Sequence, residues 1–390
     1  MFLVQNKDSI RLNDSKSLLI REMTARFLYD GELLPVCSDD SEDVRVMHRC
    51  LDVVRKGMGS SKAVGVDAGE CGAAFRFLMA LLAVMEGEWL LTGTPRLLER
   101  PVIPLVTALR SIGGFVEPVP NGWHIVGKPL HAETLTVDCS LSSQFASALL
   151  LIGPRIGLRE LVTVPDTPPS APYIAMTRYV VDEVLAGRPL RREADWSTAA
   201  FWYAFVCLSP DVDALLLRDL RMDSIQGDFI ISQIFNNLGI SSQQKDEGVW
   251  IEKTRDFNHD FKFEIDLAYN PDLAPVLAVT AVLLGRRCLL TGLDNLNLKE
   301  AHRLDVLVEE LSPFAHVSTS GGTLRIEGGK TVVDSPSLSR VMNTHGDHRM
   351  VMAFALLSLQ YDIYLSDIKC VGKSYPEFEN YFKPVPRIGK

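Results

Sequence analysis

A recurring type of apolar helix constrains the fold of this chain more than any other feature. Runs of nearly continuous apolar residues, each opened by a small or polar cluster, begin at Asp14, Gly69, Leu141, Asp195, Asn270 and Gly346. A helix that is apolar on all its sides has to be buried on all its sides. We therefore expect each of these six runs to lie inside a domain, so that helices rather than strands form the centre of the core.

Amphipathic helices and short strand-prone segments lie between these runs. The amphipathic candidates are SEDVRVMHRCLDVVRKG, ERPVIPLVTALRSIGG, PYIAMTRYVVDEV, SIQGDFIISQIFNNLGI, NLNLKEAHRLDVLVEEL and PEFENYF. The strand candidates are WLLTG, WHIVG, TLTVD, ALLLR, VWIEK, FKFEID, RCLLTG, TLRIEGG and DIYLSD. This alternation predicts an α/β or α+β fold with sheets packed on buried helices. Six units of helix, strands and helix indicate internal repeats, and the polar run GRPLRREAD predicts a domain boundary near residues 188–195.

The segment NLNLKEAHRLDVLVEEL, residues 295–311, carries the first indication of chemistry. Its apolar residues recur on one helical face, and Asn297 followed by Glu300 is a capping-box pattern that predicts a helix start at Asn297. Lys299 and Arg303 would then lie four residues apart on one face, where like charges repel. Two cations near the positive end of a helix favour a bound anion. The alternative is a solvated basic turn in which Glu300 is only a cap.

Polar side chains also gather in the first turns of the apolar helices. They are Lys16 and Ser17; Gly72 and Arg76; Ser142, Ser143 and Gln144; Asp272; and Asp347, His348 and Arg349. Helix N-termini carry unpaired backbone N–H groups, so several such ends facing one cleft would bind anions. The alternative is that the serines and Asp272 are ordinary helix caps. As a catalytic base, Asp272 would have to lie beside cations and accept a hydroxyl proton. His348 is interpreted as polar support for the cleft.

Composition narrows the classes of partner. A length of 390 residues suffices for two domains, and the net charge of −9 argues against nucleic acid or an anionic membrane as the main partner. The longest apolar run, residues 273–284, is too short to span a bilayer, and the N-terminal MFLVQNKDS lacks the pattern of a secretory signal. Seven scattered cysteines without a CxxC pair fit a reducing cytoplasm and predict no metal site.

Eleven segments, taken in order, resemble the EPSP synthase family, the 3-phosphoshikimate 1-carboxyvinyltransferases of the shikimate pathway of aromatic amino acid biosynthesis. They are SKSLLIR, DDSEDVRVM, GECGAAFRFL, LTGTPRLLERPVIPLVTALRSIGG, SLSSQFASALL, SAPYIAMT, SIQGD, PDLAPVLAVTA, NLNLKEAHRLDVLVEEL, GDHRMVMAFAL and KCVGKSYPEF. The resemblance implies an α/β protein of two domains, an inside-out α/β barrel in which each domain has three repeated units with buried parallel helices covered by sheets. The domains would be residues 15–192 and residues 1–14 plus 193–390, hinged near residue 14 and residues 188–195 and closing over substrate.

The resemblance also implies the reaction and a role for each matching residue. A cytoplasmic monomer without metal or cofactor would transfer the enolpyruvyl group of phosphoenolpyruvate to the 5-hydroxyl of shikimate 3-phosphate. Asp272 would take the hydroxyl proton, Glu300 would protonate the phosphoenolpyruvate methylene and later remove a methyl proton, and Lys16 is the third catalytic candidate. Shikimate 3-phosphate would contact Lys16, Ser17, Arg21, Ser142, Ser143, Gln144, Ser170, Tyr173, Asp272, Asn295 and Lys299. Phosphoenolpyruvate would contact Lys16, Gly72, Arg100, Gln144, Arg303, His348, Arg349 and Lys373.

Several positions depart from the family pattern. Asn13 and Asp14 replace a Pro-Gly pair; Glu70, Cys71 and Ala73 replace Asn, Ala and Thr; Ala171 replaces a lysine; and His302 replaces an acidic residue. The carboxylate of Glu70 would oppose an anion unless a neighbouring arginine pairs with it, which leaves open a non-catalytic anion-binding homologue. Enolpyruvyl transfer to UDP-N-acetylglucosamine is a further alternative. It is disfavoured because the loop TGTPRLLER lacks the reactive cysteine which that family places there.

Overall fold

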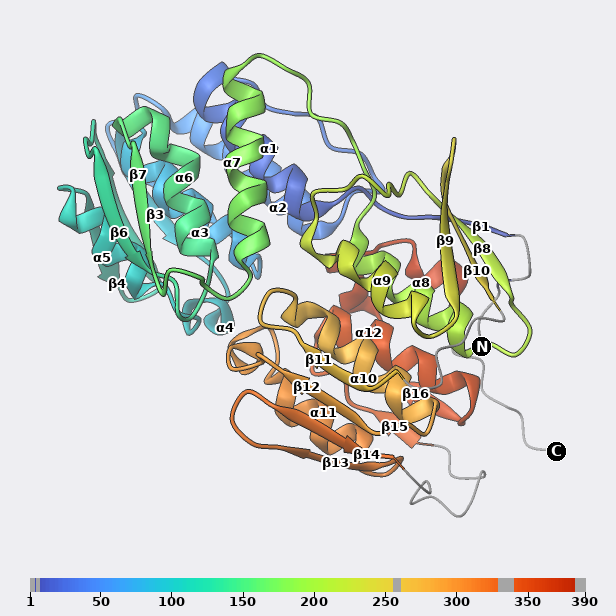
Figure 1. The fold of residues 1–390 in the computed structure, drawn as a ribbon. Coiled ribbons are helices and arrows are strands. Elements are labelled where there is room, and N and C mark those ends of the chain that lie inside the picture. The colour runs from blue at the N-terminus through green and yellow to red at the C-terminus, as the bar shows by residue number, and fades with distance from the viewer. Residues whose placement is uncertain (1–3, 5–7, 255–260, 329–339, 383–390) are drawn as a thin grey trace. The chain divides into compact units, whose positions relative to one another are not determined.

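The computed structural model describes residue 4 and residues 8–254, 261–328 and 340–382 (Figure 1). Most of the N-terminal segment MFLVQNKDS lies outside these residues. The chain divides into two compact units: unit 1 comprises residues 1–15 and 192–390, and unit 2 comprises residues 16–191. Each unit has its own hydrophobic core. Among the described residues, no helix has both the length and the apolar character needed to cross a bilayer.

Buried helices form the centre of unit 2. The helices α3 (Gly72–Val84) and α6 (Gln144–Ile156) pack against each other and are buried along nearly their whole lengths. The helix α1 (Lys16–Asp30) lies beside α7 (Ala171–Leu185), as Figure 1 shows, and also contacts α3 and α6. The remaining helices of this unit are α2 (Glu42–Gly57), α4 (Pro95–Leu98) and α5 (Ile103–Ser111).

Two sheets pack on the helices of unit 2. In the first, β2 (Val64–Asp67) runs parallel to β3 (Gly87–Thr92), and β5 (Gly122–Gly127) and β4 (Phe115–Val119) follow in antiparallel order. The second pairs β6 (Thr134–Asp138) in parallel with β7 (Glu160–Val164). The expectation of three sheet-covered units is therefore met only in part here. The segment between α1 and α2, residues 31–41, contains Pro35, which has no N–H group for a ladder, and it forms no strand.

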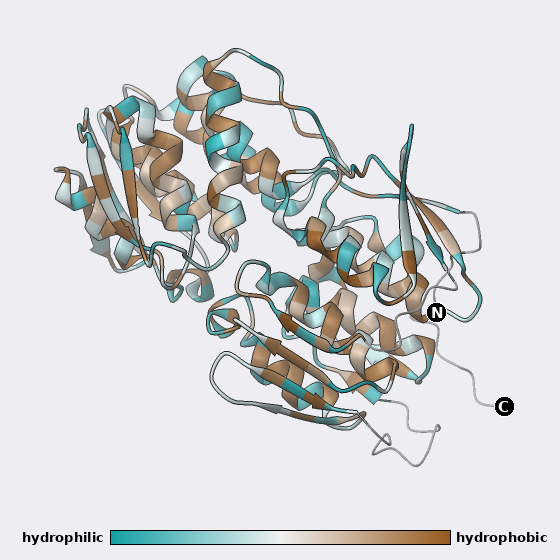
Figure 2. Ribbon diagram, in the orientation of Figure 1, coloured by the Kyte–Doolittle hydropathy of each residue, from teal (hydrophilic) through white to brown (hydrophobic). Residues whose placement is uncertain are grey.

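Unit 1 has the same kind of core. The helices α8 (Trp196–Leu208), α10 (Ala274–Leu283) and α12 (His348–Ala355) are buried, α10 contacts the other two, and their residues are largely hydrophobic, as the brown ribbons in Figure 2 show. Shorter helices complete the unit: α9 (Ile231–Asn236), α11 (Arg303–Leu311) and α13 (Phe378–Tyr381), with the 3-10 helices η1 (Gly227–Ile230), η2 (Pro271–Leu273), η3 (Leu296–Leu298), η4 (Leu356–Leu359) and η5 (Lys369–Lys373).

Three sheets are described in unit 1. The first joins β1 (Ser9–Arg11), β8 (Ala214–Arg218), β10 (Gly248–Lys253) and β9 (Ile240–Lys245); the second joins β11 (Phe263–Asp266), β12 (Cys288–Thr291), β14 (Leu324–Glu327) and β13 (His316–Thr319); the third pairs β15 (Arg340–Met342) with β16 (Ile363–Leu365). Each four-stranded sheet, here and in unit 2, consists of one parallel pair followed by two antiparallel strands. This shared order confirms the predicted internal repeat. No described sheet closes on itself, so the expected barrel is not realised as a closed sheet.

The α/β class and the positions of the apolar helices are confirmed. The six predicted runs correspond to α1, α3, α6, α8, α10 and α12, and every predicted strand segment contains a strand. The strands that were not predicted, each of three to six residues, are β1, β2, β4, β7, β9, β13 and β15.

Candidate active site

The helix predicted to begin at Asn297 begins at Arg303 instead. Residues 296–298 form η3, and the backbone at Lys299 is extended. The carboxamide oxygen of Asn297 accepts a hydrogen bond from the backbone N–H of Leu304 (2.8 Å), so Asn297 caps α11 from outside the helix. The predicted capping box with Glu300 is therefore wrong. Glu300 lies in the connection between η3 and α11, and its carboxylate pairs with cations instead.

The buried guanidinium of Arg303 binds three carboxylates in unit 1. It contacts Asp347 through Nε (2.7 Å) and Nη2 (3.2 Å), Asp272 through Nη1 (2.9 Å) and Glu300 through Nη2 (3.0 Å). The Arg303 side chain is only 1% exposed. Although burial acts against the charged form, Asp347, Glu300 and Asp272 together raise the pKa of Arg303 above its ordinary value. Arg303 therefore holds both predicted catalytic carboxylates on one rigid cation.

Asp272 lies among three cations. Besides Arg303, its carboxylate contacts Lys299 Nζ (3.3 Å) and Arg349 Nη2 (3.0 Å). Burial opposes ionisation, but Arg349, Lys299 and Arg303 hold the pKa of Asp272 well below its usual range. The prediction that Lys299 and Arg303 share a helical face is wrong, because Lys299 precedes the helix. Both side chains nevertheless contact the same oxygen, Oδ1 of Asp272.

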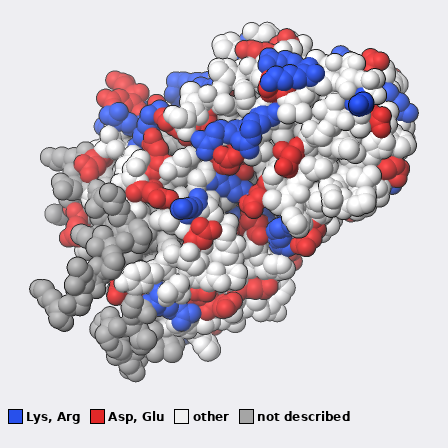
Figure 3. All heavy atoms as spheres, turned by 180° about the vertical axis from the view of Figure 1, so that it is seen from behind, with Lys and Arg blue, Asp and Glu red and all other residues white. Residues whose placement is uncertain are grey.

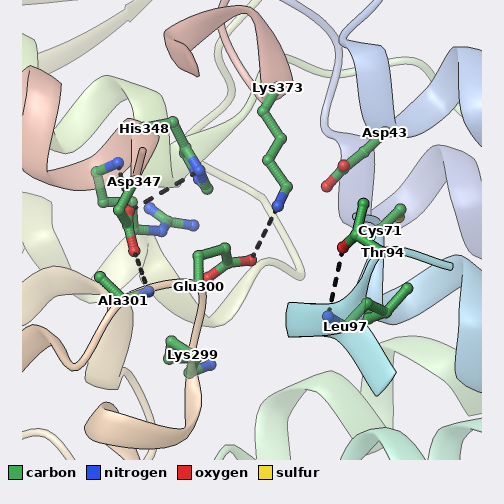
Figure 4. A network of polar contacts seen from close by, with 12 residues as sticks. Asp43, Cys71, Thr94, Leu97, Lys299, Glu300, Ala301, Asp347, His348 and Lys373 are labelled. Atoms are coloured by element: carbon green, nitrogen blue, oxygen red, sulfur yellow. Dashed lines mark hydrogen bonds and ion pairs between the residues drawn. The ribbon is translucent and has the colours of Figure 1, made fainter. Parts of the chain in front are cut away.

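Asp347 connects α11 to the first turn of α12 (Figure 4). It is fully buried, and its carboxylate accepts hydrogen bonds from the backbone N–H groups of Arg349 (2.9 Å) and Ala301 (3.4 Å). His348 Nδ1 lies 4.0 Å from the same carboxylate. On the other side of Glu300, Lys373 Nζ at the end of η5 lies 3.6 Å from Glu300 Oε1. Asp347 is therefore a buried anion with a structural role, next to the predicted binding residues His348 and Arg349.

A further buried carboxylate, Asp228 in η1, interacts electrostatically with both Asp272 and Arg349. It accepts hydrogen bonds from Asn270 Nδ2 (3.1 Å) and from the hydroxyl of Ser197. Burial raises the pKa of Asp228, an effect that Arg349 opposes. No role was predicted for this residue. Its segment SIQGD contributed to the resemblance, but an aspartate that opens an amphipathic segment looks the same whether it is buried or exposed.

Lys16 begins α1 and pairs with Asp43 in the first turn of α2. The distance from Lys16 Nζ to Asp43 Oδ2 is 3.0 Å, and the two side chains are 14% and 9% exposed. Asp43 was not predicted as a site residue. Its segment, DDSEDVRVM, carries several acidic residues, and sequence alone does not show which of them faces inward.

Arg21, one turn after Lys16, is a buried cation whose described hydrogen bonds all go to uncharged oxygens. These acceptors are Thr177 Oγ1 (2.8 Å), the Ser17 carbonyl (2.7 Å), Ser147 Oγ (3.4 Å) and the Tyr173 carbonyl (3.4 Å). Burial lowers the pKa of Arg21 to about 10. A buried guanidinium with only neutral acceptors is compatible with an incoming anion.

Arg76 joins the N-termini of α3 and α6. It donates to Gln144 Oε1 (2.9 Å) and to the carbonyls of Gly72 (3.0 Å) and Pro101 (2.8 Å). A Cβ atom at Gly72 would lie 2.6 Å from Arg100 Nη1 and 2.8 Å from Arg76 Nη1. Gly72 therefore leaves room for two guanidinium groups at one helix N-terminus.

The predicted phosphate-binding serines lie at helix starts. Ser142 Oγ, one residue before the N-cap of α6, accepts a hydrogen bond from the backbone N–H of Gln144 (3.2 Å), whereas the side chain of the N-cap residue Ser143 makes no capping hydrogen bond. Ser143 is buried at the N-cap of α6, and Ser170 has a left-handed backbone (φ 58°) at the N-cap of α7. In unit 1, Asn295 stands at the N-cap of η3, where its carbonyl accepts from the backbone N–H of Leu298 (3.1 Å).

On the face drawn in Figure 3, charges of both signs are mixed, with Lys and Arg interspersed with Asp and Glu. Within the described ranges, no group of three or more His, Cys, Asp and Glu side chains is arranged to hold a metal ion.

Comparison with known proteins decides the family. The family model described as EPSP synthase (3-phosphoshikimate 1-carboxyvinyltransferase) matches residues 39–382. The chain belongs to the EPSP synthase family. A 3-phosphoshikimate 1-carboxyvinyltransferase of Bacteroides fragilis is 31% identical over 401 residues, covering 96% of this chain and 94% of that protein. Another, from Methanoculleus marisnigri, is 31% identical over 339 residues, covering 81% and 78%.

The fold agrees with this EPSP synthase membership. A solved EPSP synthase from Acinetobacter baumannii superposes with a TM-score of 0.64 at 18% identity, covering 97% of this chain and 96% of that one. At this identity the likeness establishes the fold alone. The resemblance inferred from the eleven segments is thus confirmed as membership of the EPSP synthase family.

Proposed function

We propose that this chain transfers the enolpyruvyl group of phosphoenolpyruvate to the 5-hydroxyl of shikimate 3-phosphate, giving 5-enolpyruvylshikimate 3-phosphate and phosphate. The observation that carries the proposal is the Arg303 guanidinium, which holds the carboxylates of Asp272 and Glu300 beside Lys299, Arg349 and Lys373. Both substrates are multiply charged anions, and this arrangement offers them preorganised cations next to two candidate proton carriers. The relatives described above carry the same activity in their names.

Asp272 is the proposed base for the 5-hydroxyl proton. Its depressed pKa keeps it ionised at neutral pH, but three cations make it a weak base as it stands. A bound substrate phosphate or carboxylate would compete for Lys299 and Arg349, because an anion with several oxygens binds these cations as well as one carboxylate does. The competition would raise the pKa of Asp272 toward its ordinary range. We therefore infer that substrate binding itself activates the base.

Glu300 is the proposed acid that protonates the methylene carbon of phosphoenolpyruvate and later removes a methyl proton. Lys373 lies at the long distance of 3.6 Å from Glu300, whereas Arg303 lies at 3.0 Å. Of these two cations, Lys373 is therefore the easier one for an incoming anion to draw away from Glu300. With His348 supporting their positions, Arg303 and Arg349 complete the phosphoenolpyruvate contacts that we propose for unit 1.

The groups of unit 2 are proposed to serve the same two substrates. Ser17, Arg21 and Tyr173 would contact the carboxylate and ring of shikimate 3-phosphate, and the serines at positions 142, 143 and 170 would bind its phosphate with Lys299, next to Gln144 and Asn295. Gly72, Arg100 and Gln144 would contact phosphoenolpyruvate. Lys16, held by Asp43, would act on both substrates.

Domain closure and location complete the proposal. Two chain segments run side by side where the chain passes between the units: Ser15 N–H donates to the Glu193 carbonyl (2.9 Å) and Asp195 N–H donates to the Asn13 carbonyl (3.1 Å). We propose that the hinge near residue 14 and residues 188–195 lies here, between domains of residues 15–192 and residues 1–14 plus 193–390. All seven cysteines are free thiols, which supports a reducing cytoplasm, and we propose a monomer.

The test compares turnover with binding in two variants. Purified protein should release phosphate when both substrates are present. Asp272→Asn and Glu300→Gln should each lose about 100-fold or more in kcat, the scale of general acid–base catalysis, with shikimate 3-phosphate affinity retained. Asp213→Asn removes a carboxylate that is 71% exposed and should behave as wild type. Binding of both substrates without turnover by the wild-type protein would instead support a non-catalytic homologue.

A further inference from the structure

The Arg21 guanidinium is accessible to a ligand from only part of its periphery. Its central carbon lies 5.2 Å from the ring centroid of Phe77 and 5.7 Å from that of Tyr173, so aromatic rings pack against the planar group. The residue as a whole is 3% exposed. A ligand therefore has to meet Arg21 at its edge, where the N–H groups point.

The hydrogen-bond donors of that edge are unequally committed. A guanidinium has five N–H donors in a fixed plane. The single Nε–H is used by Thr177 Oγ1 at 2.8 Å, and one Nη1–H is used by the Ser17 carbonyl at 2.7 Å. The two contacts of Nη2, to Ser147 Oγ and the Tyr173 carbonyl, are both long at 3.4 Å. The two strong bonds thus hold Nε and one N–H of Nη1, and donor capacity remains on Nη2 and on the second N–H of Nη1.

The two hydroxyls behind Arg21 support each other. Thr177 Oγ1 lies 2.9 Å from Ser147 Oγ and 2.8 Å from the Tyr173 carbonyl, and it shares its one hydrogen between them. Both hydroxyl residues are fully buried. They come from α7 and α6, whereas Arg21 comes from α1, so this small network fixes the guanidinium relative to three helices.

We propose that Thr177, assisted by Ser147, is a positioning residue that turns the terminal nitrogens of Arg21 toward the carboxylate of shikimate 3-phosphate. The inference rests on the function proposed above, in which Arg21 meets that carboxylate. Because Thr177 occupies Nε, a side-on pairing through Nε and Nη2 is blocked, and a planar carboxylate binds end-on through Nη1 and Nη2. Shape and charge together then select a carboxylate over an uncharged substituent on the ring.

The experiment replaces the Thr177 hydroxyl by a methyl group of similar size. Thr177→Val should raise KM for shikimate 3-phosphate about tenfold, since a hydrogen bond to a charged group contributes at least that factor to an equilibrium constant. KM for phosphoenolpyruvate and kcat should stay within about twofold of wild type. Thr177→Ser, which keeps the hydroxyl, should restore the wild-type KM.

A matched control separates positioning from loss of a buried hydroxyl. Thr24 is also fully buried on α1, and its hydroxyl donates only to the Ile20 carbonyl (2.6 Å) among the described contacts. Thr24→Val should leave both KM values unchanged. If Thr177→Val does not fold, Ser147→Ala decides, with an expected rise of about threefold in KM for shikimate 3-phosphate because its bond to Nη2 is the longer one.

An analogue with a carboxamide in place of the substrate carboxylate provides the sharpest readout. With shikimate 3-phosphate, KM of Thr177→Val should be about ten times that of wild type. With the carboxamide analogue this ratio should be about one, because neither protein can form the end-on pair between Arg21 and a carboxylate. An unchanged KM for shikimate 3-phosphate in Thr177→Val, or an equal loss with the carboxamide, would overturn the inference while wild-type turnover persists. Absence of turnover in the wild-type protein would instead overturn the proposed function.

Discussion

Replacing Arg303 by methionine is predicted to destabilise unit 1 strongly. The substitution keeps much of the side-chain volume but leaves Asp347, whose side chain is fully buried, without its closest cation. Breaking a buried ion pair by removing one partner costs about 3–5 kcal/mol. Asp272 retains Lys299 and Arg349, so most of the loss falls on Asp347. For a domain of this size each kcal/mol lowers Tm by about 2–4 °C, which gives a fall of about 6–20 °C.

The assay is differential scanning calorimetry of the full chain, with two comparison variants. Arg287→Met removes an arginine that is 83% exposed and lies 3.9 Å from Glu327, so Tm should change by less than about 2 °C. Asp347→Asn keeps a capping side chain at the start of α12 and removes the charge, so adding it to Arg303→Met should recover part of the lost stability. If Arg303→Met is no less stable than Arg287→Met, or if adding Asp347→Asn lowers Tm further, then Arg303 does not stabilise the folded protein by neutralising buried Asp347.

Three further predictions concern a buried acid, a helix N-terminus and a cap. Burial raises the pKa of Glu193 in the folded protein, so ionisation of this side chain lowers the free energy of unfolding. This loss of stability is absent below about pH 4 and grows as the pH rises through the folded-state pKa. Glu193→Gln, which can still accept from Ser224 and Gln226, should raise Tm at pH 7 and change it less at pH 4, as measured by thermal melts at both pH values. Gly72→Ala would place a methyl group against Arg100 and Arg76. It should raise KM for phosphoenolpyruvate about tenfold and leave KM for shikimate 3-phosphate unchanged. An equal rise in both KM values would contradict the assignment of Gly72 to the phosphoenolpyruvate site. Asn297→Ala removes the cap of α11 and should cost about 1 kcal/mol in urea unfolding.

The buried helices were predictable because local composition alone decides them. A run such as Ala274–Leu283 has no polar face, so no arrangement other than full burial suits it. The short strands β2, β13 and β15 were missed because a segment of only three or four residues carries little periodic signal. Their pairing depends on partners that are distant in sequence.

The start of α11 shows how tertiary contacts override a local pattern. A capping box contributes about 0.5–2 kcal/mol, whereas the buried Arg303 contacts three carboxylates that come from three separate segments. Local patterns identified Arg303 as an anion-binding candidate and Asp272 as a possible base, and the family resemblance added the acid role of Glu300. The sequence did not identify Asp43, Asp228 or Thr177. Each of these residues becomes the partner of a site residue only when folding brings together segments that are distant in sequence.

The most direct test of the central claim is phosphorus NMR of the purified chain with both substrates. If the chain transfers the enolpyruvyl group, the phosphoenolpyruvate signal will be replaced by an equal amount of inorganic phosphate, while the ester signal of shikimate 3-phosphate will shift to that of a new phosphate monoester. Neither substrate alone should change. Persistence of both starting signals, in protein that binds both compounds by calorimetry, would show that the chain does not catalyse the transfer.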